Sequence, residues 1–202
     1  MGWLTLDMED LASIQAFAKQ AAAEYPKLNV LINNAGIMKL EDLRTATGTE
    51  IAEQTIAINL LGPIRLTAAL LPLLQQQTQS TIMTVSSGLA FVPMAPTPAY
   101  CATKAAIHSY TQSLRYQLRA TTTEVLELIP PYVGTDLLGR GADDPRAMPL
   151  DKFIAEVMEI LKTQPKATEI CVENIKRLRF AAESGNYDAV FNGLNEAMAG
   201  LH

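Results

Sequence analysis

The chain has 202 residues, of which 49% are apolar and 18% charged, and its formal net charge is −5. This length and composition suit a globular protein with one large buried core. An acidic balance with no run of lysine or arginine argues against nucleic-acid binding and against attachment to an anionic membrane surface.

The most apolar stretch of the chain, residues 56–74, fits a buried helix better than a membrane span. It is interrupted by Asn59, Gly62, Pro63 and Arg65, a mixture that a membrane span does not readily tolerate. No charged leader precedes an apolar core at the start, so we expect a cytoplasmic protein without a membrane partner. The two cysteines are far apart and lack a nearby histidine pair, so neither a disulfide framework nor a metal site is expected.

The first part of the chain predicts a strand, a helix and a second strand. Residues 4–6 form a short apolar run of strand character. Asp10 is a typical N-cap, and apolar residues follow it at helical spacing until Pro26. Residues 30–32 are a continuous apolar run bounded by turn-forming residues 33–36, a pattern typical of a strand buried on both faces.

The rest of the chain alternates between helices and strands. We expect helices at residues 49–76, 98–119 and 150–162, strands at 81–85, 125–129 and 169–172, a Gly-, Pro- and Asp-rich loop at 130–149, and a mostly helical tail. This alternation predicts an α/β fold with a mainly parallel sheet. No repeat or linker interrupts it, so residues 1–202 are expected to form a single domain.

Tyr100 and Lys104 are the first candidate catalytic pair. They lie four residues apart on a predicted helix and therefore share one face. An ammonium near a phenol favours the phenolate and lowers the phenol's pKa, which allows proton exchange near neutral pH. Taken alone, the pair favours an exposed tyrosine over a solvated lysine by a wide margin.

Ser87 strengthens the case because it follows a predicted strand, thirteen residues before Tyr100. Ligands of parallel α/β sheets bind at the carboxyl ends of the strands, so a serine there and a following helix with Tyr100 and Lys104 converge on one edge. The alternative is a serine that only caps a turn or helix, a role that Ser86 could equally fill.

Asn59 lies in the middle of the long predicted helix, where asparagine is unfavourable. Pro63 has no N–H, so the Asn59 carbonyl four residues earlier loses its helical partner. This frees an acceptor at a kink, where water or a lysine ammonium could bind. Kinks at proline are also commonly structural.

Together these residues resemble the motifs of the short-chain dehydrogenase/reductase family, in family order and spacing. The matching segments are Asn33-Asn34-Ala35-Gly36, Asn59-x-x-Gly62, Ser87 and Tyr100-x-x-x-Lys104. Asp7-Met8-Glu9-Asp10 is similar to the family's acidic turn beside the adenine ring. Residues 130–135 resemble its segment at the nicotinamide, with Pro131 where the family has glycine. The residues at 86–91 and 129–131 are closest to the DltE-like branch.

The resemblance implies a Rossmann-like, doubly wound fold and hydride transfer between a nicotinamide cofactor, NAD or NADP, and a small carbonyl or alcohol substrate. It implies that Tyr100 is the general acid/base and that Ser87 binds the substrate oxygen. Lys104 would lower the pKa of Tyr100 and hold the nicotinamide ribose. Asn59 would anchor a water through its backbone carbonyl. The implied catalytic set is Asn59, Ser87, Tyr100 and Lys104.

The resemblance also implies a set of cofactor-binding positions. Thr135 would contact the nicotinamide carboxamide, and the loop after Pro131 would cover the substrate. The complete implied set is Asp7, Asn33, Ala35, Gly36, Tyr100, Lys104, Pro130 and Thr135.

One motif of the family, its Gly-rich turn of the Thr-Gly-x-x-x-Gly-x-Gly kind, does not occur in the sequence. Its glycines would let backbone approach the pyrophosphate at a helix N-terminus. The resemblance thus implies a fold without its first βαβ portion, a truncated relative. We expect residues 4–6 to pair with residues 30–32, because an exposed apolar edge favours aggregation.

Two functions therefore remain open: an NAD(P)-dependent oxidoreductase, or a non-catalytic relative that acts only by oligomerising. The family commonly pairs its two long helices across a two-fold axis, which implies a homodimer. Apolar residues at 66–74 and 107–118 suit that interface, although they suit an ordinary core equally well.

Overall fold

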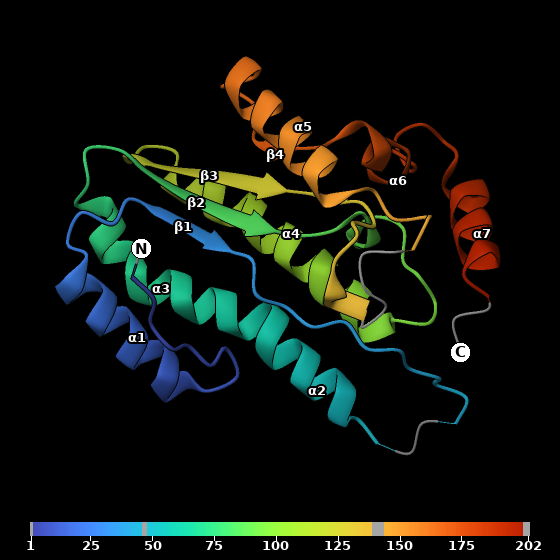
Figure 1. Cartoon of the computed structure of the whole chain (residues 1–202), viewed down its shortest axis with the longest axis horizontal. Helices are drawn as coiled ribbons and strands as arrows, with labels where there is room; N and C mark the ends of the chain where they lie inside the picture. Colours follow the sequence, from blue (N-terminus) through green and yellow to red (C-terminus); the bar gives the residue numbers. More distant parts are fainter. Residues whose placement is uncertain (1, 46–47, 139–143, 200–202) are drawn as a thin grey trace.

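The structure is a computed structural model, and it describes residues 2–45, 48–138 and 144–199. Its centre is a four-stranded sheet of β1 (Val30–Asn33), β2 (Ser80–Val85), β3 (Thr123–Leu128) and β4 (Glu169–Ile170). All neighbouring strands are parallel, in the order β1-β2-β3-β4 (Figure 1). The expected α/β fold with a parallel sheet is confirmed.

Two long helices cover one face of the sheet. The first consists of α2 (Glu50–Ile56), a π-helical segment (Ala57–Leu61) and α3 (Gly62–Gln75), and the second is α4 (Pro98–Leu118). Side chains on this face bond directly to the helices: Asn33 Nδ2 donates to Thr67 Oγ1 on α3 at 2.9 Å. A hydrogen bond of 2.7 Å joins the Thr84 hydroxyl on β2 to the Thr111 hydroxyl on α4.

The apolar residues at 66–74 and 107–118 belong mainly to the core of the chain. Leu66, Leu70 and Leu74 of α3 are at most 5% exposed, and Ile107 and Leu114 of α4 are also buried. Leu66, Leu70, Leu74 and Leu114 belong to one core cluster with Ile82 and Val125 of the sheet. Of the two interpretations that the sequence allows, the ordinary core is therefore the one that the structure shows for these residues.

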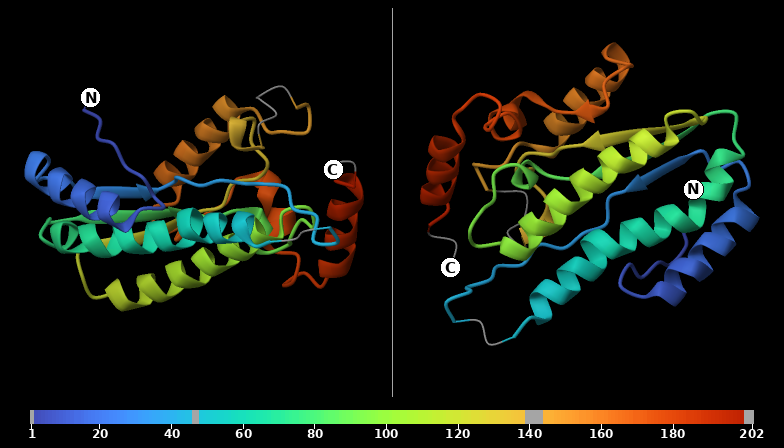
Figure 2. Two further views of the ribbon diagram at one scale, coloured as in Figure 1. Left: turned by 90° about the horizontal axis from the view of Figure 1, so that it is seen from below. Right: turned by 180° about the vertical axis from the view of Figure 1, so that it is seen from behind.

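Helix α1 (Leu11–Glu24) packs on α3 through Ile14, Ala18 and Ala21. Asp10 caps it as expected, because its carboxylate accepts the N–H groups of Ala12 and Ser13 at 2.9 and 3.1 Å. The helix thus lies beside α3 at the side of the molecule (Figures 1 and 2).

The expected strand at residues 4–6 is wrong. These residues form no strand, and β1 pairs only with β2, so the proposed pairing of residues 4–6 with 30–32 does not occur in the described chain. Leu4 and Leu6 instead pack, partly buried, against the core. A two-sided burial of β1 is also wrong: Leu31 and Asn33 are buried, whereas Val30 and Ile32 are 46% and 55% exposed.

The opposite face of the sheet is covered only toward β3 and β4. Helix α5 (Leu150–Thr163) lies there, on the other side of the sheet from α4 (Figure 2). The chain continues through α6 (Lys176–Arg179) to α7 (Tyr187–Ala197), which stands at the end of the sheet where β2 and β3 terminate (Figure 1).

By length and composition, the helix Glu50–Gln75 is apolar enough to cross a membrane. Core helices of globular proteins can be equally long and apolar, so this is weak evidence for a membrane span. This helix also carries buried polar groups. Thr55, Asn59 and Thr67 are each at most 2% exposed, and each bonds to another group of the chain.

Candidate active site

The structure brings Ser87 and Tyr100 together just beyond the carboxyl end of β2. Ser87 is the N-cap of the short 3₁₀-helix Gly88–Ala90, and its Oγ accepts the Leu89 N–H at 3.1 Å. Tyr100 lies in the first turn of α4 and is only 6% exposed. Both residues line the same cavity, and the Ser87 side chain acts on Tyr100 by lowering its pKa. Ser87 therefore caps a helix, as the alternative interpretation holds, and also contacts Tyr100.

Lys104 lies one turn further along α4, with its Nζ 5.5 Å from the centre of the Tyr100 ring. The Nζ donates to the backbone carbonyl of Val85, the last residue of β2, at 2.7 Å. Burial lowers the pKa of Lys104 to about 8. An ammonium has three donors, so this contact still leaves the side chain able to bond a ligand.

The pKa of Tyr100 shifts in the direction opposite to the one expected from the sequence. Burial raises it to about 12, and the hydrogen bond to Ser87 only partly opposes this. In this structure the Lys104 ammonium bonds to the Val85 carbonyl rather than to the phenol, and burial is the largest influence on the pKa of Tyr100. The expectation fails because spacing along a helix does not reveal burial.

The Asn59 side chain bonds to the loop that follows β1. It lies in the π-helical segment before Pro63, where the Gly62 N–H reaches back to the Ala57 carbonyl. Its Oδ1 accepts the Ile37 N–H, and its Nδ2 donates to the Ile37 carbonyl, both at 2.8 Å. This paired contact fixes the loop that follows β1. This side-chain contact was not expected from the sequence, and the expected role of the Asn59 carbonyl stays a prediction.

Gly36 lies where the β1 loop comes closest to the catalytic candidates. A Cβ at this position would lie 3.2 Å from Asn59 Oδ1 and 4.0 Å from Lys104 Nζ. Any larger residue would therefore crowd the Asn59 contact and the space beside Lys104. The glycine keeps that space open for a ligand.

A cavity of about 650 Å³ contains most of the expected site. Of the residues implied by the resemblance, those in its lining are Ala35, Gly36, Ser87, Tyr100, Lys104, Pro130 and Thr135. They come from the carboxyl ends of three neighbouring strands and the start of α4, as the parallel sheet predicts.

Three of the implied residues are not in the cavity lining. Asn59 lies behind it and holds the β1 loop. Asn33 is 5% exposed and bonds to Thr67, and its Oδ1 is buried without a partner among the described residues. Asp7 is exposed and accepts the N–H of Glu9 at 2.9 Å. The structure therefore does not bring Asp7 to the cavity.

No local sequence pattern predicts the apolar part of the cavity. Met38, Leu89, Met94, Leu194 and Met198 form it, and the last two come from α7 and the residue after it. Asn195 fastens α7 in place: its Oδ1 accepts the Ala95 N–H at 2.6 Å and its Nδ2 donates to the Pro93 carbonyl at 3.2 Å. These contacts join residues a hundred positions apart, which no local pattern reveals.

Comparison with known proteins agrees with this geometry. The short chain dehydrogenase family matches residues 2–145 of the chain. The chain belongs to this family. The uncharacterized oxidoreductase DltE of Bacillus subtilis is 38% identical over 194 residues, which are 94% of this chain and 76% of that protein. The expected family and its DltE-like branch are both confirmed.

More distant similarities exist to another curated protein and to solved structures. The NADP-dependent 3-hydroxy acid dehydrogenase of Schizosaccharomyces pombe is 31% identical over 66% of this chain, which spans only 51% of that protein. A short chain dehydrogenase of Burkholderia cenocepacia, solved in complex with NADP, superposes with a TM-score of 0.79 at 20% identity. The match covers 95% of this chain and 80% of that one, so it shows a shared fold.

Proposed function

We propose that this short-chain dehydrogenase is an NAD- or NADP-dependent oxidoreductase that interconverts a carbonyl compound and an alcohol. The observation that carries the proposal is the convergence of Ser87, Tyr100 and Lys104 in the wall of one cavity at the carboxyl ends of the strands. Buried titratable groups with perturbed pKa values in a cavity, here Tyr100 and Lys104, are typical of a catalytic site.

The side chains have complementary roles in the reduction direction. With a pKa near 12, Tyr100 is protonated at neutral pH and can give its proton to the substrate oxygen. Ser87 donates a hydrogen bond to the same oxygen as charge develops on it. Below about pH 8 Lys104 is a cation and stabilises the phenolate that Tyr100 leaves behind. When bound, the nicotinamide supplies or accepts the hydride.

The residues present fit the nicotinamide end of such a cofactor. Gly36 and Ala35 offer a wall with little side chain, and a Cβ at Gly36 would occupy space next to Lys104. Lys104 has donors for the ribose hydroxyl groups. Pro130 and Thr135 line the cavity after β3, where the carboxamide would bind. The exposed Asp7 has no part in this fit.

A direct test compares two tyrosines of the same helix. Tyr100→Phe removes the proposed proton donor, and Tyr110→Phe changes a half-buried tyrosine outside the cavity lining. Ketone reduction, followed by loss of the reduced nicotinamide absorbance, should fall about 10²- to 10⁴-fold in the first variant and little in the second. Equal activity in both variants would refute the role of Tyr100.

Cofactor titration separates this proposal from that of a non-catalytic, oligomerising relative. NADH and NADPH are each titrated against the protein and followed by nicotinamide fluorescence. Micromolar binding of either supports an oxidoreductase. Failure of both to bind at millimolar concentration would favour the non-catalytic relative.

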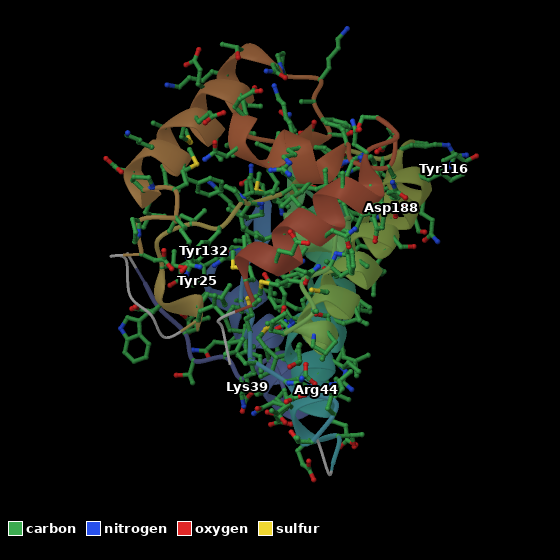
Figure 3. All side chains as sticks on the ribbon, turned by 90° about the vertical axis from the view of Figure 1, so that its right-hand side faces the viewer. Tyr25, Lys39, Arg44, Tyr116, Tyr132 and Asp188 are labelled. Carbon is green, nitrogen blue, oxygen red and sulfur yellow. The ribbon has the colours of Figure 1, made fainter. Side chains whose placement is uncertain are left out.

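We also propose a homodimer through the two long helices. The support is a set of apolar side chains that these helices leave exposed, namely Ile56, Leu61 and Tyr116 at 41%, 38% and 67%. Tyr116 projects from α4 away from the chain (Figure 3). Sedimentation equilibrium of the protein and of Tyr116→Lys tests this, because a charge in the interface should shift the equilibrium toward monomer.

A further inference from the structure

The cavity divides into a polar and an apolar part. Ser87, Tyr100 and Lys104 lie at the ends of the strands, and the apolar group of Met38, Leu89, Met94, Leu194 and Met198 lines the part formed with α7. Methionine is flexible and polarizable, so a wall with three methionines adapts to hydrocarbon ligands of irregular shape. This part of the cavity suits an apolar ligand body.

A second apolar surface continues from the cavity along α5. Leu150 and Ile154 are four residues apart on one face of the helix, line the cavity, and are 48% and 50% exposed. Phe153 and Leu137 line the same region. Exposed apolar residues that adjoin a cavity mark a binding surface more often than isolated ones do. The wall therefore offers hydrocarbon contact beyond the immediate surroundings of Tyr100.

Of the two cations in the described lining, Lys104 belongs to the proposed catalytic and cofactor site, and Arg146 is already paired with a carboxylate. Lys104 Nζ lies beside Tyr100 and donates to the Val85 carbonyl. The guanidinium of Arg146 donates to the Asp144 carboxylate from Nε at 3.0 Å and from Nη2 at 2.6 Å. Arg146 and Asp144 thus form a neutral pair. A substrate carboxylate or phosphate would have to leave water without gaining an unpaired cation, which is unfavourable.

We infer that the substrate is an uncharged ketone or aldehyde with a bulky hydrocarbon body, or the corresponding alcohol. The carbonyl group meets Ser87 and Tyr100, and the hydrocarbon body packs on the methionine wall and along Leu150 and Ile154. This inference rests on the proposed function for the reaction. Binding of the hydrocarbon body can be measured without that reaction.

Methyl NMR of the methionines tests binding directly. The protein is labelled at its methionine methyl groups, and acetophenone or its para-carboxylate is added, with assignments from single Met→Leu variants. Acetophenone should shift Met38, Met94 and Met198 and leave Met8 unchanged, because Met8 lies beneath Gly62 outside the cavity lining. The carboxylate should bind at least about tenfold more weakly. Equal or tighter binding of the carboxylate, or no shift at the three cavity methionines, would overturn the inference.

A matched pair of variants on α5 tests the role of charge. Ile154→Lys places an unpaired cation at the cavity wall, and Met158→Lys places one a turn further along, at a residue 47% exposed and outside the lining. Ile154→Lys should tighten binding of the para-carboxylate about tenfold and weaken binding of acetophenone. Met158→Lys should alter neither. The same response from both variants would contradict a site that includes Ile154.

Turnover distinguishes failure of this inference from failure of the proposed function. Methionine shifts with acetophenone but no NADH or NADPH binding would remove the oxidoreductase proposal and leave the apolar site standing. Turnover that prefers the para-carboxylate, or acetone over heptyl methyl ketone, would keep the oxidoreductase and overturn the apolar substrate.

Discussion

The two edges of the sheet differ in how they are finished. At one edge, Ile170 of β4 is 1% exposed and packs with α5 in a core of its own. At the other, β1 pairs with no strand except β2 among the described residues, and its Val30 and Ile32 are about half exposed. We call the first the closed edge and the second the open edge. Leu178 packs both on the core of the closed edge and against Val190 of α7, the helix that carries part of the apolar cavity lining. The lining residues Asn34–Gly36 follow β1 at the open edge. The apolar lining is thus supported by a second core, whereas the Asn34–Gly36 lining follows a half-exposed strand.

The two edges also differ in their ionisable side chains. Glu127 of β3 is fully buried, and its two carboxylate oxygens lie 2.8 and 3.0 Å from His108 Nδ1 on α4. Glu169 of β4 accepts Arg179 Nε and Nη2 at 2.7 and 3.2 Å, and that guanidinium stacks 4.5 Å from the Phe91 ring. His108, Glu127 and Glu169 are spaced closely enough for a metal ion, but Arg179 already supplies the positive charge. At the open edge, Val30 and Ile32 offer only apolar surface.

The largest expected effect on stability concerns Arg179, which bonds to Glu169 of β4 and stacks on Phe91 at the closed edge. Arg179→Met removes the cation from the partly buried Glu169 and the stacking on Phe91, so the free energy of unfolding should fall by about 3 kcal/mol. Urea unfolding followed by circular dichroism measures this. Glu183→Gln is the matched control, because it removes only the exposed partner of the same arginine and should change stability little. If both variants were equally stable, the closed edge would not depend on this ion pair.

The next effect concerns Lys104, which lies between the two edges. Its pKa falls from 10.5 to about 8, so burial of the charged form costs roughly 3 kcal/mol at about 1.4 kcal/mol per pKa unit. Lys104→Met should therefore raise the free energy of unfolding at pH 7 by up to that amount while it removes activity.

The dependence of this effect on pH has a definite sign. Between about pH 8 and 10.5 the folded chain has lost the Lys104 proton and the unfolded chain still binds it, so the stability of the unmodified protein rises with pH. The advantage of Lys104→Met should shrink between pH 7 and 9.5 in urea unfolding. Lys152→Met, at an exposed residue, is the control. A constant advantage across this range would contradict a buried ammonium.

Most of the fold could be predicted from the sequence, because its signals are local. The Asp10 cap, the helical spacing and the Gly- and Pro-bounded apolar runs locate the helices and strands to within a few residues. The strand at residues 4–6 could not be excluded locally, since a strand exists only through a partner. Val30 and Ile32 are exposed because they point to the face of the sheet that helix α5 covers only toward β3 and β4.

The site was predictable in position and less so in chemistry. Motif spacing placed Ser87, Tyr100 and Lys104 together, because strand ends and a following helix converge in a parallel sheet. The pKa of Tyr100 depends on burial, and the Asn59 contact depends on a π-helical turn. Motif spacing predicts neither of them. The apolar wall needed contacts between α7 and residues 93–95, which only the tertiary structure provides.

The smallest expected effect on stability concerns β1 at the open edge, and it tests whether the exposed face of this strand is free or covered in solution. A double variant, Val30→Thr with Ile32→Thr, keeps β-branched side chains on β1 and reduces apolar surface that already faces water. Its free energy of unfolding should change by less than about 0.5 kcal/mol, and its self-association, measured by light scattering, should decrease because exposed apolar edges favour it. Leu31→Ala, on the buried side of the same strand, should cost about 2 kcal/mol or more. If the double variant were as costly as Leu31→Ala, β1 would be covered in solution, and the contrast between the two edges would disappear.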